Sequence, residues 1–320
     1  MKKLFLILFL FLAEYAAALS QDTPPPIIDI HLHGYDAVPP DVKADWAGEF
    51  NARQLTSPES ADIHFMKVVE EMEKHNIRLG IVSSTSLQAL DKWKSARPDL
   101  FLTGIQTDYG RPILSPDSLK LMYEIGKVDV LGELGLQYYG LEPDAPSLSS
   151  YYKVAEENGI PVCLHTGLGP PGGPHSFAPD FRTTLGKPSL FEPVLVKHPN
   201  LKAFLAHAGW PYLSETIAMM YIYPELYVDI GVIAWALPKN AFYSALKELV
   251  DAGFGKRIMF GSDQMIWPGA ITIAVETVNE APFLTETERR DIFYNNAARF
   301  LELSEDEKFE HHSGKSTKGK

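Results

Sequence analysis

The sequence has little cysteine: Cys163 is the only one among 320 residues. No disulfide can therefore form within one chain, and the fold must be stabilised by its core. Cys163 lies in an apolar strand, two residues before a histidine. We interpret it as a small core residue, with a soft metal ligand as the alternative.

Positive charge is also scarce. The chain has 29 Lys and Arg residues against 41 Asp and Glu, which gives a formal net charge of −12 at pH 7. This balance repels nucleic acid unless a local basic patch exists, and the sequence has none before its C-terminal tail. The expected partner is a small-molecule substrate rather than a nucleic acid, and self-association into a homo-oligomer is left open.

Long apolar runs are absent apart from one at the N-terminus. Two lysines precede the apolar run 4–13, and Ala-Leu-Ser at 18–20 is typical of a cleavage site, so residues 1–20 are predicted to be a secretory signal peptide. The run is too short to span a bilayer. We therefore expect an exported protein, periplasmic or secreted, without a stable membrane anchor after signal removal. Residues 21–26, which include three prolines, would form a short stiff linker.

The rest of the chain alternates short apolar strands with helices, and its length suits one large domain. Eight strands are predicted, at 27–34, 79–82, 101–105, 128–134, 160–164, 201–206, 226–230 and 257–261. This count predicts an α/β fold, a (β/α)8 TIM barrel over residues 27–303, with a doubly wound open sheet as the alternative. Residues 304–320 are polar and without periodicity, and are predicted to be a disordered tail.

Two histidines one residue apart, His31 and His33, end the first strand. Because side chains alternate along a strand, the two imidazoles point to the same side and can form half of a metal site. Four later strand ends carry further metal-ligating residues. They are Glu133, His165, His207 and Asp263. Only a closed barrel brings all these ends around one point, so the pattern favours the barrel and predicts a divalent-metal site at its rim.

Glu133 lies inside an apolar strand, where an ionised carboxylate needs a compensating cation. We interpret it as a ligand that bridges two ions; the alternative is a carboxylate outside the ligand set of a single ion. Asp229, at the end of the seventh strand, is interpreted as a residue that orients a ligand. Nitrogen and oxygen donors without thiolate lead us to expect one or two Zn²⁺ ions per chain, with Mn²⁺ or Fe²⁺ as alternatives.

Five side chains beyond the strand ends are candidates for substrate contacts. They are Tyr138, His175, Arg182, Trp210 and Trp267. Aromatic rings together with one cation would line a pocket for a small ligand, including an anionic one. Packing between loops is the alternative interpretation for each of them.

Taken together, these motifs resemble the amidohydrolase superfamily, in particular its amidohydrolase-related (family 2) branch. The resemblance rests on the His-x-His opening, the His165 strand, His-Ala-Gly-Trp-Pro from His207, Gly-Ser-Asp ending at Asp263, and Asn-Ala-Ala-Arg-Phe at 296–300. It implies a TIM barrel with one or two divalent ions at the residues predicted above. His207 would bind a second ion or, with a single ion, act as a general acid/base.

The resemblance implies an enzyme that hydrolyses or decarboxylates a small molecule. We expect hydrolysis of a lactone, ester or amide by a metal-activated water, with Asp263 and His207 as catalytic residues. The alternatives are a metal-dependent non-oxidative decarboxylase and a non-catalytic metal-containing binding protein. The strand around Glu133 also resembles TatD-type nucleases, but Gln137 stands where those proteins have Asp, so we set the nuclease aside.

Overall fold

The structure is a computed structural model, and it describes residues 24–108 and 110–314. The predicted signal peptide, 1–20, and the first part of the predicted linker, 21–23, lie outside the described residues. Within the described ranges, no helix has the length and apolar character that crossing a membrane requires.

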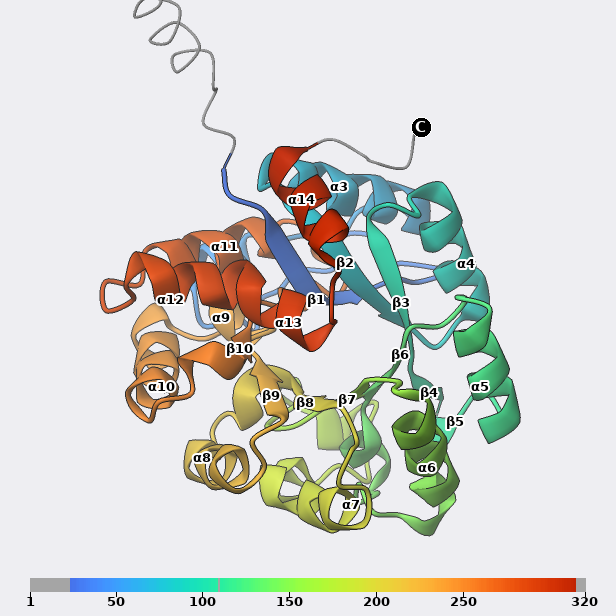
Figure 1. The fold of residues 1–320 in the computed structure, drawn as a ribbon. Helices are drawn as coiled ribbons and strands as arrows, with labels where there is room; N and C mark the ends of the chain where they lie inside the picture. The colour runs from blue at the N-terminus through green and yellow to red at the C-terminus, as the bar shows by residue number, and fades with distance from the viewer. Residues whose placement is uncertain (1–23, 109, 315–320) are drawn as a thin grey trace, which may run out of the picture.

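Eight parallel strands follow one another around a nearly closed barrel in chain order, and helices cover its outside (Figure 1). The strands are β1 (Ile27–His33), β2 (Ile77–Ser84), β3 (Phe101–Ile105), β6 (Val130–Leu134), β7 (Val162–Leu164), β8 (Ala203–Leu205), β9 (Leu226–Asp229) and β10 (Ile258–Met259). The remaining two, β4 (Thr107–Asp108) and β5 (Arg111–Pro112), form a small hairpin. The predicted TIM barrel is confirmed, although the later strands are shorter than predicted.

The barrel closes where the segment after β10 meets β1. The Ile30 N–H donates to the Phe260 carbonyl at 3.0 Å, and the Asp263 N–H donates to the His31 carbonyl at 2.8 Å. These two bonds join residues that are more than 200 positions apart in the sequence. They also hold His31, in the first strand, next to Asp263, which follows the last strand.

A buried carboxylate reinforces this closure. Asp29 accepts hydrogen bonds from the backbone N–H of Ser262 at 2.9 Å and of His31 at 3.1 Å. Burial raises the pKa of Asp29 to about 7, against the effect of these hydrogen bonds. The side chain therefore ties the first strand to the residues that follow the last one.

The outer layer consists of helices that follow the strands. The longer ones are α3 (Ala61–Lys74), α4 (Leu87–Ala96), α5 (Pro116–Glu124), α6 (Ser149–Asn158), α8 (Leu213–Ile222), α10 (Lys239–Asp251) and α11 (Ala270–Asn279). The shorter ones are α2 (Phe50–Arg53), α7 (Glu192–Lys197), α9 (Ile233–Ala236), α12 (Glu286–Arg290) and α13 (Asn296–Phe300). Serine side chains cap α3, α4 and α5, where Ser60, Ser86 and Ser115 each accept a backbone N–H and so satisfy an otherwise unpaired donor.

Cys163 lies in the buried apolar cluster inside the barrel, as the sequence predicted.

The predicted disordered tail is wrong for residues 305–313, which form helix α14 (Glu305–Ser313). Ser304 and Glu307 make a reciprocal capping box at its start, and this local signal outweighs the polar composition. The helix is attached to the barrel through His311, whose Nδ1 lies 3.0 Å from the Tyr294 hydroxyl. Residues 315–320 lie outside the described part of the chain.

Candidate metal centre

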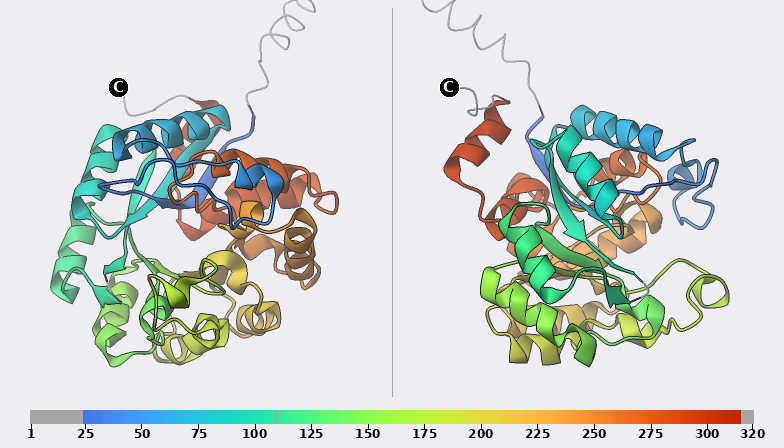
Figure 2. Two further views of the ribbon diagram at one scale, coloured as in Figure 1. Left: turned by 180° about the vertical axis from the view of Figure 1, so that it is seen from behind. Right: turned by 90° about the vertical axis from the view of Figure 1, so that its right-hand side faces the viewer.

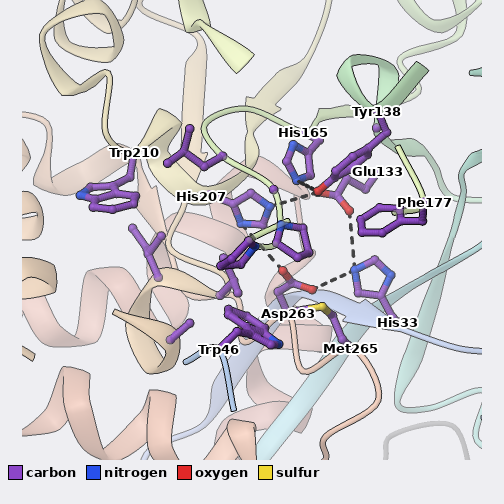
Figure 3. Close-up of a pocket in the computed structure, with 18 of the residues that line it drawn as sticks. His33, Trp46, Glu133, Tyr138, His165, Phe177, His207, Trp210, Asp263 and Met265 are labelled. Carbon is purple, nitrogen blue, oxygen red and sulfur yellow. Dashed lines mark hydrogen bonds and ion pairs between the residues drawn. The ribbon is translucent and has the colours of Figure 1, made fainter. Parts of the chain in front are cut away.

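The structure brings the six predicted metal ligands together at the C-terminal end of the barrel strands (Figure 3). They are His31, His33, Glu133, His165, His207 and Asp263. Each lies at the end of a strand or in the turn that follows it, so the parallel barrel alone places them at one rim. All six are at most 7% exposed.

The Glu133 carboxylate stands between two pairs of imidazoles. Its Oε2 lies 3.4 Å from His31 Nε2 and 3.6 Å from His33 Nε2. Its Oε1 lies 3.2 Å from His207 Nε2 and 3.9 Å from His165 Nε2. Each carboxylate oxygen therefore faces a different pair, which is the arrangement that a bridging ligand requires.

Asp263 faces the same cluster from the other side. Its Oδ1 lies 2.9 Å from His33 Nε2 and 3.9 Å from His31 Nε2, and its Oδ2 lies 3.9 Å from His207 Nδ1. Asp263 and His207 both have a left-handed backbone, with φ of 47° and 61°. Such a conformation costs a residue other than glycine about 1–3 kcal/mol and is concentrated at functional sites.

Hydrogen bonds fix the orientation of two ligand rings. His31 Nδ1 lies 2.9 Å from Asp229 Oδ2, and His207 Nδ1 lies 3.0 Å from the Gly231 carbonyl. Because a carboxylate and a carbonyl can only accept, both Nδ1 atoms carry the proton, and both Nε2 atoms are turned toward Glu133. The contact between Asp229 and His31 is the one expected of a residue that orients a ligand.

The charges of the cluster suit a cation. Burial opposes ionisation of Glu133, but the surrounding imidazoles hold the pKa of that carboxyl well below its usual range. They lower the pKa of Asp263 in the same way, against burial. Burial lowers the pKa of His165 to about 4, so this imidazole is neutral and can offer a nitrogen lone pair to a cation. Burial also disfavours charge on His31, but the carboxylates around it, Asp229 first, raise its pKa well above the usual value.

Four buried side-chain atoms of the cluster make no hydrogen bond of regular geometry: His31 Nε2, Glu133 Oε1, His165 Nδ1 and Asp263 Oδ1. Unpaired buried polar atoms are rare in proteins because each one costs about 1–3 kcal/mol. The six residues contain two groups of ligand atoms that lie within 4.8 Å of one another, namely His31–His33–Asp263 and Glu133–His165–His207. A third such group, His31–His207–Asp229, shares two of these histidines. The residues present therefore fit one or two divalent ions.

A cavity of about 750 Å³ opens onto this cluster. Of the predicted substrate contacts, Tyr138 and Trp210 line it, and the Tyr138 hydroxyl lies 2.8 Å from His165 Nε2. Trp46, Phe177 and Met265 also line it, although the sequence had not assigned them to a site (Figure 3). They lie on loops that follow strands, and in a TIM barrel such loops surround the active site.

The loops after β1 and β7 project from the same end of the molecule, shown in blue and yellow-green in the right-hand view of Figure 2. The first supplies Trp46 and the second supplies Phe177 to the cavity. The signal in the sequence was an aromatic residue within an unusually long connection. That signal does not distinguish a cavity wall from loop packing.

Trp267 does not line the cavity, contrary to the prediction. Its indole N–H donates to the Val42 carbonyl at 2.8 Å, and its ring packs against Trp46 and Trp235 with centroid distances of 5.9 and 6.1 Å. Trp267 thus supports a wall residue rather than contacting the cavity itself.

Arg182 and His175 are also not among the residues that line the cavity, so the prediction of a cation in the pocket is wrong. The Arg182 guanidinium donates to the carbonyls of Pro179 and Phe181, at 2.9 and 2.7 Å, within its own loop. His175 is exposed in the loop after β7. Position in the sequence placed both in the correct loop, but only the loop's own hydrogen bonds determine where the side chains point.

Chelation should lower the melting temperature of the protein by about 5 °C or more if the cluster binds a metal. An ion at a hundred times its dissociation constant stabilises the folded state by about 2.7 kcal/mol. Differential scanning calorimetry with and without chelator measures the shift. The double variant His31→Ala/His33→Ala should hold less metal and lose the shift, and unchanged metal occupancy in it would contradict the site.

Asp229→Asn should weaken metal affinity by about 10–100-fold, because residues that orient a ligand ring contribute about that much. The amide can still accept the backbone N–H groups that Asp229 now accepts, from His207 and Gly231, but it loses the charge beside His31. Competition with a coloured chelator measures the affinity, and Asp306→Asn, on an exposed position of α14, is the control. An unchanged affinity would show that Asp229 is not an orienting residue.

A family model described as Amidohydrolase matches residues 28–303. Similar solved structures include an uncharacterised TIM-barrel protein from Bordetella bronchiseptica, with a TM-score of 0.60, 20% identity, and coverage of 87% of this chain and 98% of that one. Another is a probable 2-pyrone-4,6-dicarboxylic acid hydrolase from Acinetobacter baumannii, with a TM-score of 0.59, 13% identity, and coverage of 87% of this chain and 99% of that one. A third is a 2,6-dihydroxybenzoate decarboxylase from Rhizobium, with a TM-score of 0.55, 16% identity, and coverage of 88% of this chain and 99% of that one. At these identities the similarity shows the fold alone.

Among curated proteins, the chain is similar to protein fluG of Emericella nidulans, with 24% identity over 168 residues. The aligned part covers 48% of this chain but 18% of fluG, so the chain spans only a small part of that protein.

Proposed function

Because this chain belongs to the amidohydrolase family, we propose that it is a metal-dependent hydrolase of a small lactone, ester or amide. The observation that carries the proposal is the position of Glu133 between two pairs of histidines. A carboxylate in that place suits a site with two ions, an arrangement found in many hydrolytic enzymes.

The residues divide into two groups around Glu133. His31, His33 and Asp263 would hold one ion, and His165 and His207 would hold the other, with Glu133 shared. A bound divalent ion supplies Lewis acidity and lowers the pKa of water toward about 7. Zn²⁺ is the ion we propose, with Mn²⁺ and Fe²⁺ as alternatives for the same donors.

Asp263 is the proposed general base. Its carboxylate stays ionised because the surrounding imidazoles lower its pKa, and it faces the cavity. It takes a proton from the attacking water as the water oxygen bonds to the carbonyl carbon. The bond to the leaving oxygen or nitrogen then breaks, and that atom takes the proton from Asp263.

Tyr138 is the proposed donor to the substrate from the opposite wall. Its half-buried side chain places the hydroxyl 2.8 Å from His165 Nε2, and burial together with the charges of Glu133 and Asp263 raises the pKa of Tyr138 well above its usual value. The hydroxyl therefore stays neutral and can donate a hydrogen bond to a substrate oxygen.

Decarboxylation is the second candidate, and one observation favours it. The His207 ring is fixed through Nδ1 by the Gly231 carbonyl, which leaves Nε2 directed into the cluster. With a single ion held by His31, His33 and Asp263, this nitrogen would be free to deliver a proton to a substrate carbon.

Metal analysis of the purified protein followed by a substrate screen tests the proposal. We expect acid release from neutral esters or lactones after loading with Zn²⁺, Mn²⁺ or Fe²⁺, measured with a pH indicator. Release of CO₂ from hydroxybenzoates without ester hydrolysis would favour the decarboxylase. Ligand binding without any turnover would favour a binding protein.

A further inference from the structure

We propose that the substrate is a neutral aromatic ester or lactone that carries no charged group away from the bond to be cleaved. This inference rests on the proposed hydrolase function and specifies its substrate class. It comes from the walls of the cavity above the metal cluster, not from the cluster itself.

The first observation is the charge of the walls. Apart from the histidines of the cluster, the charged side chains among the described lining residues are Glu133 and Asp263, and no Lys or Arg is among them. Glu133 and Asp263 belong to the metal cluster, so a carboxylate on a remote part of the substrate would enter a partly buried space whose other walls hold no cation to pair with it. Burying an unpaired charge costs several kcal/mol.

The uncharged polar groups of the walls offer little to an anion. They include Thr85, Gln106 and Thr107, which are few beside the apolar lining. One of the two N–H groups of the Gln106 amide is already used, because its Nε2 lies 3.2 Å from His33 Nδ1. Carboxylate substrates are usually held by arginine in a bidentate pair, and no such pair can form here among the described lining residues.

The second observation is the aromatic walls. Trp46 and Trp210 stand on one side of the cluster, and Tyr138 and Phe177 stand on the other (Figure 3). The Tyr138 and Phe177 rings are 5.9 Å apart. Aromatic walls on both sides of an opening favour a flat apolar group between them.

The Trp46 ring is held rigidly. It packs against Trp235 and Trp267, with centroid distances of 5.5 and 5.9 Å. These two indoles are fixed in turn by hydrogen bonds to the carbonyls of Ser262 and Val42, both at 2.8 Å. A wall ring fixed in this way contacts a ligand with little loss of side-chain entropy.

A pair of esters tests the inference on the metal-loaded enzyme. The neutral probe is 2-naphthyl acetate, and its partner is 6-acetoxy-2-naphthoate, which has the same scissile bond and a carboxylate at the far ring. We expect kcat/KM to be at least about tenfold higher for the neutral ester, after correction for the rates of hydroxide hydrolysis. Equal values, or a preference for the carboxylate, would overturn the inference and leave the hydrolase function intact.

A matched pair of variants tests the wall. Phe177 and Phe309 are 61% and 60% exposed, but only Phe177 lines the cavity. We expect Phe177→Ala to lower kcat/KM for 2-naphthyl acetate about three- to tenfold and to leave methyl acetate unchanged. Phe309→Ala should leave both unchanged. An equal loss on both esters in Phe177→Ala would show that the ring does not select aromatic substrates.

Binding separates failure of this inference from failure of the proposed function. If neither ester is hydrolysed with any ion, the hydrolase function is contradicted. Tryptophan fluorescence then compares 2-acetonaphthone with 6-acetyl-2-naphthoate, since Trp46 and Trp210 line the cavity. Tighter binding of the neutral ketone supports the substrate class, and equal or weaker binding overturns it.

Discussion

Asp263→Asn is expected to lower kcat by about 10²-fold or more while the protein keeps its metal. Asparagine has the size of aspartate and retains one oxygen donor, but it cannot accept a proton from water. Asp263 Oδ1 lies 2.9 Å from His33 Nε2, so the amide can stay in place beside that ring. Steady-state kinetics and metal analysis of the same preparation measure the two effects separately.

The control for this variant is Asp251→Asn, on the exposed surface of α10. It removes the same charge far from the cluster and should leave kcat unchanged. Turnover close to that of the unmodified enzyme in Asp263→Asn would remove Asp263 from the chemistry. Loss of metal together with activity would assign the residue to binding alone.

Glu133→Gln is expected to remove about one metal ion per chain. Each Glu133 oxygen faces its own pair of histidines, and an amide replaces one of these oxygens by a group that cannot bind a cation. The loss of charge also weakens attraction for the remaining ion, so activity should fall sharply. The metal concentration from elemental mass spectrometry, divided by the concentration of folded protein, gives the stoichiometry.

The comparison variant is Glu124→Gln, an exposed position at the end of α5. It should hold as much metal as the unmodified protein. A stoichiometry of one in both the unmodified protein and Glu133→Gln would contradict the bridge. His207 would then be free of metal, and the decarboxylase would become the better proposal.

The barrel and its ligand cluster were predictable because both depend on strands. The alternation of side chains along a strand can be recognised from the local sequence. In a barrel of parallel strands, residues at the strand ends, such as His33, His165 and Asp263, then meet at one rim. The cluster therefore needed no knowledge of loop conformation. The same reasoning explains why Tyr138, which lies in the short turn of helix at Leu136–Tyr139 after β6, was placed at the cavity.

The cavity walls were harder to predict because loop side chains depend on contacts distant in the sequence. Arg182 is held by carbonyls of its own loop, and Trp267 by Val42, which is 225 positions away. Neither contact leaves a pattern in the sequence. As a result, Arg182, the predicted cation of the pocket, is absent from the lining residues that the structure describes. Trp46 lines the cavity, where Trp267 was predicted to do so.

The bond between the Asp263 N–H and the His31 carbonyl has a consequence for synthesis of the chain. A ribosome releases the two histidines of β1 early and Asp263 only near the end, so for most of its translation a growing chain lacks the third member of the His31–His33–Asp263 group. Asp263 arrives together with β10, the strand that closes the barrel. Premature termination or C-terminal proteolysis before β10 thus yields fragments that expose histidines without Asp263. A fragment that ends just before β10 keeps the other five residues of the cluster and differs from the completed molecule there by Asp263 alone.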